Sequence, residues 1–237
     1  MASEWYYLQF GKMKIYFTIL CSLLTQNVFP QLQPEVITSS EIAIIYRDST
    51  QTSTPIDTMF ENEVFLISEN NASNSDWIPV DVPQNKMSKS KSGIIDFYKK
   101  GYVKKEDVKL LDELPKMTEN RVGITFQIIK AIAPKEIPEE NLMYGLETSL
   151  EGSYQVDEML IGWKGEIRLI DPLFYEDLYN VSPTVGELSS YNNKEFKIFQ
   201  KGESFFIKHK CSDGAGSYEI TWVIKDGNVQ QRLIDTI

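Results

Sequence analysis

Two short stretches, Trp77-Ile78-Pro79-Val80 and Gly101-Tyr102-Val103, decide how the first half of the chain is interpreted. Each joins an aromatic residue to β-branched neighbours, a composition that favours β-strands. Pro79 cannot donate a hydrogen bond to a neighbouring strand, so we expect the strand over residues 77–82 to lie at an edge or a bulge. Further strands are predicted at residues 41–47 and 63–67, after a short polar lead at residues 31–40.

The order of features around these stretches resembles the bacterial SH3 family. In chain order the features are a strand ending in Arg47, a hydroxyl-rich loop, an apolar strand after Glu63, Trp77 two residues before Pro-Val, Gly101-Tyr102-Val103, Val108 and the pair Leu110-Leu111. The resemblance covers about residues 36–114, and its departure is the stretch 83–100, which is longer than a simple hairpin needs. It implies a small SH3-like barrel that binds an extended peptide on aromatic side chains.

Trp77 and Tyr102 are the candidate ligand contacts that this resemblance implies. Both side chains combine a large apolar ring with one polar atom, so each either fills a small core or forms the floor of a groove. The residues themselves leave both roles open.

Positive charge is concentrated in the enlarged loop and the strand that follows it. The lysines of this group are Lys86, Lys89, Lys91, Lys99, Lys100, Lys104, Lys105 and Lys109. One interpretation is a solvated loop whose charges keep an edge strand from pairing with another chain. The alternative is contact with an anionic partner, such as a cell-wall polymer or an acidic protein surface. Lys99 and Lys100, next to Gly101, therefore join Trp77 and Tyr102 as candidate ligand-binding residues.

The second half of the chain, residues 121–237, is predicted to be a separate β-rich domain after a polar linker at 115–120. Apolar residues alternate with smaller or polar ones over 122–128, which indicates a half-buried strand. Strands are also predicted at residues 144–148, 159–163, 166–170, 205–210, 218–224 and 229–234. Only residues 174–179 have helical character, so the fold class is mostly β with few helices.

The end of this half carries the clearest local signals. Asp213-Gly214 and Asp226-Gly227 stand between alternating runs, and Asp-Gly in that position predicts β-hairpins. We therefore expect the domain to end in an antiparallel meander over residues 196–235. Tyr218, Ile220 and Trp222, together with Ile224, share one face of a strand, and that face is predicted to be buried.

The N-terminus has the order of a secretory signal. Lys12 and Lys14 precede an apolar run over residues 15–24, and the polar stretch Thr25-Gln26-Asn27 follows. The run is shorter than the roughly 20 residues that a membrane-spanning helix needs. Residues 1–30 are predicted to be a signal peptide, with no transmembrane span after its removal, and the alternative is a buried N-terminal element. The expected location is the periplasm or the cell surface.

Known catalytic and metal-binding patterns are not matched by the sequence. His209 is the sole histidine, and Cys211 is the sole cysteine outside the predicted signal. His209 and Cys211 would be neighbours on one strand, which leaves little room for a substrate between them, and no third group is identified that would orient the imidazole as a base. We therefore expect both side chains to lie in the core. Zinc sites need three or four suitable ligands, and neither Asp-Gly turn has the spacing of a calcium loop. We therefore predict no catalytic residue, no metal site and no cofactor.

Charge and composition restrict the function further. The chain has 24 basic and 34 acidic residues, a net charge of −10, which argues against non-specific binding to nucleic acid or anionic lipid. The sequence predicts an exported, non-enzymatic binding protein whose SH3-like module recognises a cell-wall peptide or a protein segment. Two alternatives stay open: a periplasmic inhibitor or immunity-type protein that binds a basic partner, and a hydrolase that uses carboxylates. The candidate carboxylates include Asp157, Glu158, Asp171, Glu176 and Asp177.

Overall fold

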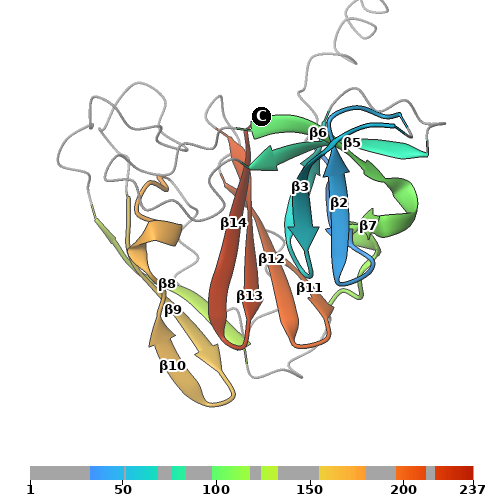
Figure 1. Ribbon diagram of the computed structural model, residues 1–237. Helices are drawn as coiled ribbons and strands as arrows, with labels where there is room; N and C mark the ends of the chain where they lie inside the picture. The colour runs from blue at the N-terminus through green and yellow to red at the C-terminus, as the bar shows by residue number, and fades with distance from the viewer. Residues whose placement is uncertain are drawn as a thin grey trace, which may run out of the picture. The chain divides into compact units, whose positions relative to one another are not determined.

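The computed structural model describes residues 33–50, 52–68, 76–83, 98–117, 124–132, 155–179, 196–211 and 217–236. The chain divides into two compact units, residues 1–31 and 32–237, and every described residue belongs to the second unit. The predicted signal peptide and the strand predicted at 144–148 lie outside the described residues. The described part is mostly β, as predicted, with antiparallel sheets and short 3-10 turns (Figure 1). None of its helices is long and apolar enough to cross a membrane.

A seven-stranded antiparallel sheet contains the strands of the first half. Its strands are β1 (Glu35–Thr38), β2 (Ile42–Tyr46), β3 (Pro55–Phe60), β4 (Val64–Ile67), β5 (Trp77–Pro83), β6 (Tyr98–Lys104) and β7 (Val108–Leu110). They lie in the order β3-β2-β6-β5-β4-β1-β7. The described strands leave β3 and β7 as open edges, so closure into an SH3-like barrel stays a prediction.

One face of this sheet encloses its own core. Buried side chains from all seven strands form one cluster, among them Val36 of β1, Met59 of β3 and Val108 of β7. Strands at both edges contribute to the same cluster, so the sheet is strongly curled. Gly101 on β6 permits this curl, because a Cβ atom at that position would overlap the Cγ2 atom of Ile45 on β2.

The prediction of a polar lead before the first strand is wrong. Residues Glu35–Thr38 form β1, which pairs with β4 on one side and β7 on the other, and all four residues are buried. The stretch looked polar because only Val36 and Ile37 are apolar in it. Glu35 is nevertheless buried, because Lys208 from the second half neutralises its carboxylate.

Four further strands form a second antiparallel sheet, in chain order. These are β11 (Phe196–Lys201), β12 (Ser204–Cys211), β13 (Tyr218–Lys225) and β14 (Asn228–Thr236). Figure 1 shows them side by side in orange to red. Asp226 and Gly227 both have positive φ, 52° and 72°, as a two-residue hairpin turn between β13 and β14 requires.

Both faces of this sheet are buried. Tyr218, Ile220, Trp222 and Ile224 are at most 1% exposed, which confirms the predicted buried face of β13. This face packs against strand β9 (Gln155–Trp163) and the segment after β10 (Glu166–Leu169), with Trp163 and Phe205 in edge-to-face contact. Strand β9 lies between β10 and β8 (Ile124–Ile132) in a three-stranded sheet.

The opposite face of the same sheet packs against the first half of the chain. A common cluster, which we call the shared core, consists of Ile37, Val64, Leu66, Leu111, Leu114, Phe199, Phe206, Val223 and Leu233. Polar contacts surround it: the side chain of Gln231 accepts from Val64 N and donates to Val64 O, each at 2.8 Å. Val223, Thr221 and Glu219 on β13 are therefore buried as well.

Part of the predicted linker is involved in this packing. Met117 N donates to Ile198 O at 2.9 Å, and Gln200 N donates to Pro115 O at 3.2 Å, so residues 115–117 run along β11. The domain limits 36–114 and 121–237 stay predictions. The described residues of the two stretches nevertheless share a core and lie in one compact unit.

Candidate functional site

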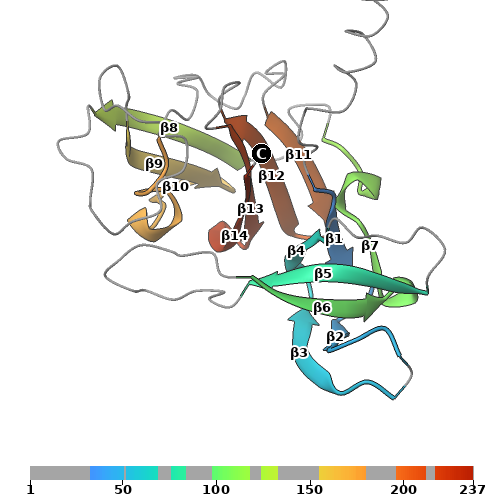
Figure 2. The same cartoon turned by 90° about the horizontal axis from the view of Figure 1, so that it is seen from above.

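A pocket of about 470 Å³ opens where β5 begins and β6 ends. Its lining residues are Tyr46, Asp76, Trp77, Lys104, Lys105 and Glu106, a set that we call the Trp77 pocket. Trp77 and Lys104 are directly opposite each other in the β5–β6 ladder, and the two strands run side by side in Figure 2. Lys105 begins the 3-10 turn η2 (Lys105–Asp107), and its N–H donates to Asp76 O at 2.9 Å. The pocket wall is thus held by backbone hydrogen bonds.

Two aromatic side chains give the pocket its apolar surface. The rings of Tyr46 and Trp77 lie with their centroids 5.2 Å apart and their planes at 84°, an edge-to-face arrangement. Both residues are half-buried, so each ring packs on its neighbour and still contacts solvent. Part of each ring is therefore accessible to a ligand, and the ligand-contact role of Trp77 stays a prediction.

Tyr102 lies next to the pocket without lining it. It is directly opposite Tyr46 on β2 and Pro79 on β5, and it is half-buried. Side chains directly opposite in adjacent strands project from the same face of a sheet. Tyr46, Tyr102 and Pro79 therefore form an apolar row across three strands, beginning at the Trp77 pocket.

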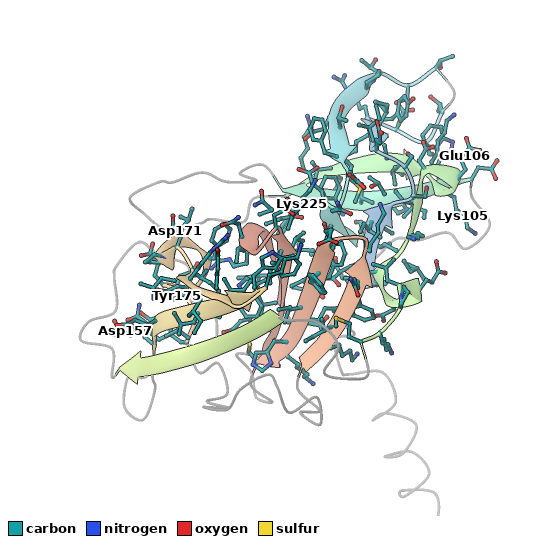
Figure 3. The ribbon with its side chains drawn as sticks, turned by 90° about the horizontal axis from the view of Figure 1, so that it is seen from below. Lys105, Glu106, Asp157, Asp171, Tyr175 and Lys225 are labelled. Atoms are coloured by element: carbon teal, nitrogen blue, oxygen red, sulfur yellow. The ribbon has the colours of Figure 1, made fainter. Side chains whose placement is uncertain are left out.

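Lys99 and Lys100 do not reach the pocket. Both are exposed on β6, opposite Val82 and Asp81 respectively. Lys100 precedes Lys104 by four residues, which places it roughly 13 Å away along the strand. Lys104 and Lys105 supply the positive charge at the Trp77 pocket instead, and Figure 3 shows Lys105 projecting outward beyond the end of β6. Lys86, Lys89 and Lys91 lie outside the described residues.

The charges of the pocket are of both signs and accessible to solvent. Lys104 Nζ lies 3.6 Å from Glu106 Oε1, and these side chains are 45% and 75% exposed. Pairs so exposed hold each other weakly, by about 0–1 kcal/mol, so both groups can exchange this contact for a ligand. Asp76 and Lys105 are exposed too. The pocket can therefore contact an anionic and a cationic group at the same time.

Of the six lining residues, only Trp77 was predicted from the sequence to be a site residue. Lys104 and Lys105 belong to the lysine group noted above. If the pairing of Trp77 with Lys104 had been known, it would have identified these two lysines as the ones next to Trp77. That pairing depends on the register across the loop at residues 84–97, for which the sequence has no signal. Tyr46 is the last residue of β2 and directly precedes Arg47, one of the residues on which the resemblance rests. The pairing of β2 with β6 brings Tyr46 to the pocket.

His209 and Cys211 lie in the core, as predicted. Both have 0% exposure, and Cys211 Sγ donates to His209 O at 3.9 Å. Tyr218, opposite Cys211, donates its hydroxyl hydrogen to Tyr179 O at 3.1 Å. Burial first, and the neighbouring thiol second, raise the pKa of Tyr218 well above its ordinary value. These groups fasten the segment that ends at Tyr179 to the sheet.

Several of the candidate carboxylates have structural partners. Asp171 accepts from Leu173 N at 3.1 Å and so caps the 3-10 turn η4 (Pro172–Phe174). Asp177 forms a buried two-point ion pair with Arg232. Tyr175, labelled with Asp157 and Asp171 in Figure 3, donates to the backbone oxygen of Asp157 at 3.3 Å. Burial raises the pKa of Tyr175, and the nearby carboxylates of Glu158, Asp157 and Asp171 act in the same direction.

Within the described ranges, no three His, Cys, Asp or Glu side chains are placed to hold a metal ion. The comparisons with known proteins add no relative: no family model, no curated protein and no solved structure matches the chain.

Proposed function

We propose that the chain is an exported, non-enzymatic binding protein of the periplasm or cell surface, and that its first half is an SH3-like module. Its ligand is a cell-wall peptide or a segment of another protein. The observation that supports this function is the open Trp77 pocket, in which two half-exposed aromatic rings lie beside accessible lysines. Rigid aromatic side chains provide contact area at low entropic cost, which suits reversible binding of a short peptide.

The chemistry of the lining selects the kind of peptide. Lys104 and Lys105 attract carboxylates, whereas Asp76 and Glu106 attract an ammonium group. A ligand with charges of both signs satisfies all four, and cell-wall peptides carry free carboxylates and amines. The apolar row of Tyr46, Tyr102 and Pro79 continues from the pocket, and Lys100 lies further along β6. An extended peptide that crosses this row contacts both the pocket and Lys100.

The test is co-sedimentation of the full chain with purified cell wall, followed by fluorescence titration with soluble wall peptides. Trp77→Ala and the double variant Lys104→Ala/Lys105→Ala are expected to weaken binding by roughly tenfold or more. Ile167→Ala is the matched control, because Ile167 is 75% exposed on β10 and does not line the pocket. Circular dichroism checks that each variant is folded. Unchanged binding by a folded Trp77→Ala variant contradicts the proposal.

The net charge of −10 favours one further candidate, an inhibitor or immunity-type protein that binds a basic partner. Opposite net charges speed association of two proteins, and the effect declines with salt. Affinity capture from an envelope extract at low and at high salt separates the two functions. A stoichiometric complex with one basic protein, lost at high salt and kept by Trp77→Ala, supports the inhibitor.

A further inference from the structure

A second crevice, of about 250 Å³, lies between the β3–β4 turn and the β13–β14 hairpin. One wall is formed by Phe60, Glu61 and Asn62, and the other includes Lys225 and Gln230. Lys225, the last residue of β13, is labelled in Figure 3. The crevice has no residue in common with the Trp77 pocket.

The floor of this crevice is held rigidly. Gln231 is bound through both ends of its amide to the backbone of Val64, which fixes β14 to β4. In the turn, Glu63 N donates to Phe60 O at 3.0 Å and Glu63 Oε2 accepts from Phe60 N at 2.7 Å. Asn62 takes a positive φ of 67° and is only 6% exposed. The two walls therefore keep their spacing without a ligand, which lowers the entropic cost of binding.

The rim, by contrast, is accessible. The ring of Phe60 is 56% exposed, although burial of a side chain of this size would stabilise the fold. Glu61, Lys225 and Gln230 are exposed around it, so their carboxylate, ammonium and amide groups are accessible to a ligand. A carboxylate accepts, an ammonium donates and an amide does both, so the rim offers acceptors and donors together.

We propose that this crevice binds a neutral saccharide. A sugar ring has an apolar C–H face that can stack on Phe60, and its hydroxyl groups donate and accept at its edge, where Glu61, Lys225 and Gln230 lie. The lining carries the carboxylates of Glu61 and Glu63 against the single ammonium group of Lys225, so it does not attract a strongly anionic ligand, whereas an uncharged sugar needs only the donors and acceptors of the rim. The volume lies just below the range of about 300–1,000 Å³ for drug-sized ligands and fits one ring of an oligosaccharide.

The test is a titration of the full 15N-labelled chain with chitotriose, cellotriose and maltotriose, followed by NMR. At least one of these sugars is expected to shift the amide signals of residues 60–63 and 225–231 saturably, with a Kd of about 1 mM. Phe60→Ala and Gln230→Ala are each expected to weaken that binding by roughly tenfold. Ile42→Ala is the matched control, because Ile42 lies opposite Phe60, is 51% exposed and does not line the crevice.

Two outcomes overturn the proposal. One is the absence of saturable shifts with all three sugars at about 10 mM. The other is binding that a folded Phe60→Ala variant and a folded Gln230→Ala variant both retain. The Trp77→Ala variant is expected to bind the sugar as the native chain does. Failure of the crevice and failure of the Trp77 pocket are thus measured separately.

Discussion

Lys208 Nζ on β12 lies 2.7 Å from the carboxylate of Glu35 on β1, and this buried ion pair joins the two halves of the chain. Lys208 also lies 2.8 Å from Glu219 on β13. The exposed fractions of the three side chains are 7%, 4% and 10%. Burial by itself lowers the pKa of Lys208, but the two carboxylates together raise it above its ordinary value. The ammonium group of Lys208 is therefore the positive charge that stabilises both buried carboxylates, Glu35 and Glu219.

Removal of that ammonium group is expected to destabilise the chain severely. Lys208→Met leaves Glu35 and Glu219 buried without their cation, and loss of one partner of a buried pair costs about 3–5 kcal/mol. Urea unfolding of both proteins measures the change. Lys164→Met is the matched control: it breaks the pair with Glu203, where both side chains are about two-thirds exposed, and should cost at most about 1 kcal/mol. Equal effects of the two substitutions would contradict this role of Lys208.

The same cluster is expected to make stability depend on pH. Burial raises the pKa of Glu35 above its usual 4.5, although Lys208 acts in the opposite direction. A raised pKa means that the folded state takes up a proton more readily than the unfolded state. The stabilisation linked to this proton is complete at low pH and is lost as pH rises through the pKa of the folded state.

Glu35→Gln isolates this contribution, because glutamine does not titrate. The free energy of unfolding of the native chain, minus that of Glu35→Gln, is expected to decrease as the pH rises above about 4.5 and through the raised pKa of Glu35 in the folded state. Urea unfolding at several pH values measures the difference. Carboxylates remote from this cluster titrate in the same way in both proteins and cancel. A difference that stays constant, or increases, with pH would show that burial does not control the ionisation of Glu35.

The hairpin turn at Gly227 is expected to tolerate no side chain. Its φ is 72°, and a Cβ atom there would approach Cβ and Cγ of Trp163 to 2.7 Å. Gly202 has a similar φ of 60° but nothing within 4 Å. Gly202→Ala should cost about 1–2 kcal/mol from backbone strain alone, and Gly227→Ala should cost clearly more. Thermal unfolding ranks the two variants, and the reverse ranking would disprove the close packing of the turn on Trp163.

The two halves are expected to depend on each other for folding. A fragment of residues 33–117 exposes Ile37, Val64 and Leu66, and a fragment of residues 118–237 exposes Phe206 and Val223, all members of the shared core. Residues 32–237 should unfold in one cooperative transition, whereas each fragment should lack one. Calorimetry of the three proteins tests this. A fragment that unfolds cooperatively by itself would support the predicted domain limits instead.

Strand β13 shows how far sequence reasoning reaches in this fold. The period-two pattern correctly predicted that Tyr218, Ile220 and Trp222 lie on a buried face. Glu219 and Thr221 lie on the opposite face, and polar side chains such as these are usually exposed to solvent. They are buried because Lys208 and Glu35 supply partners for them. Those partners lie on other strands, and no local pattern reports a contact of that kind.

The candidate site has the same division between local and non-local signals. Trp77 was identified from its own neighbourhood in the sequence. Lys104 and Tyr46 reach it only through the pairing of β5, β6 and β2, which depends on the register of strands far apart in the chain. Strand β1 was missed for a related reason: with two apolar residues it has little local signal, and its neighbours β4 and β7 stabilise it.

The complete burial of Cys211 has a practical consequence for fluorophore labelling. Thiol reagents need access to the sulfur atom, and Cys211 is the cysteine of the described part of the chain. Lys105→Cys would therefore place the one reactive attachment point of that part at the mouth of the Trp77 pocket. An environment-sensitive dye coupled there would report directly on occupancy of the pocket, with the native thiol left in place.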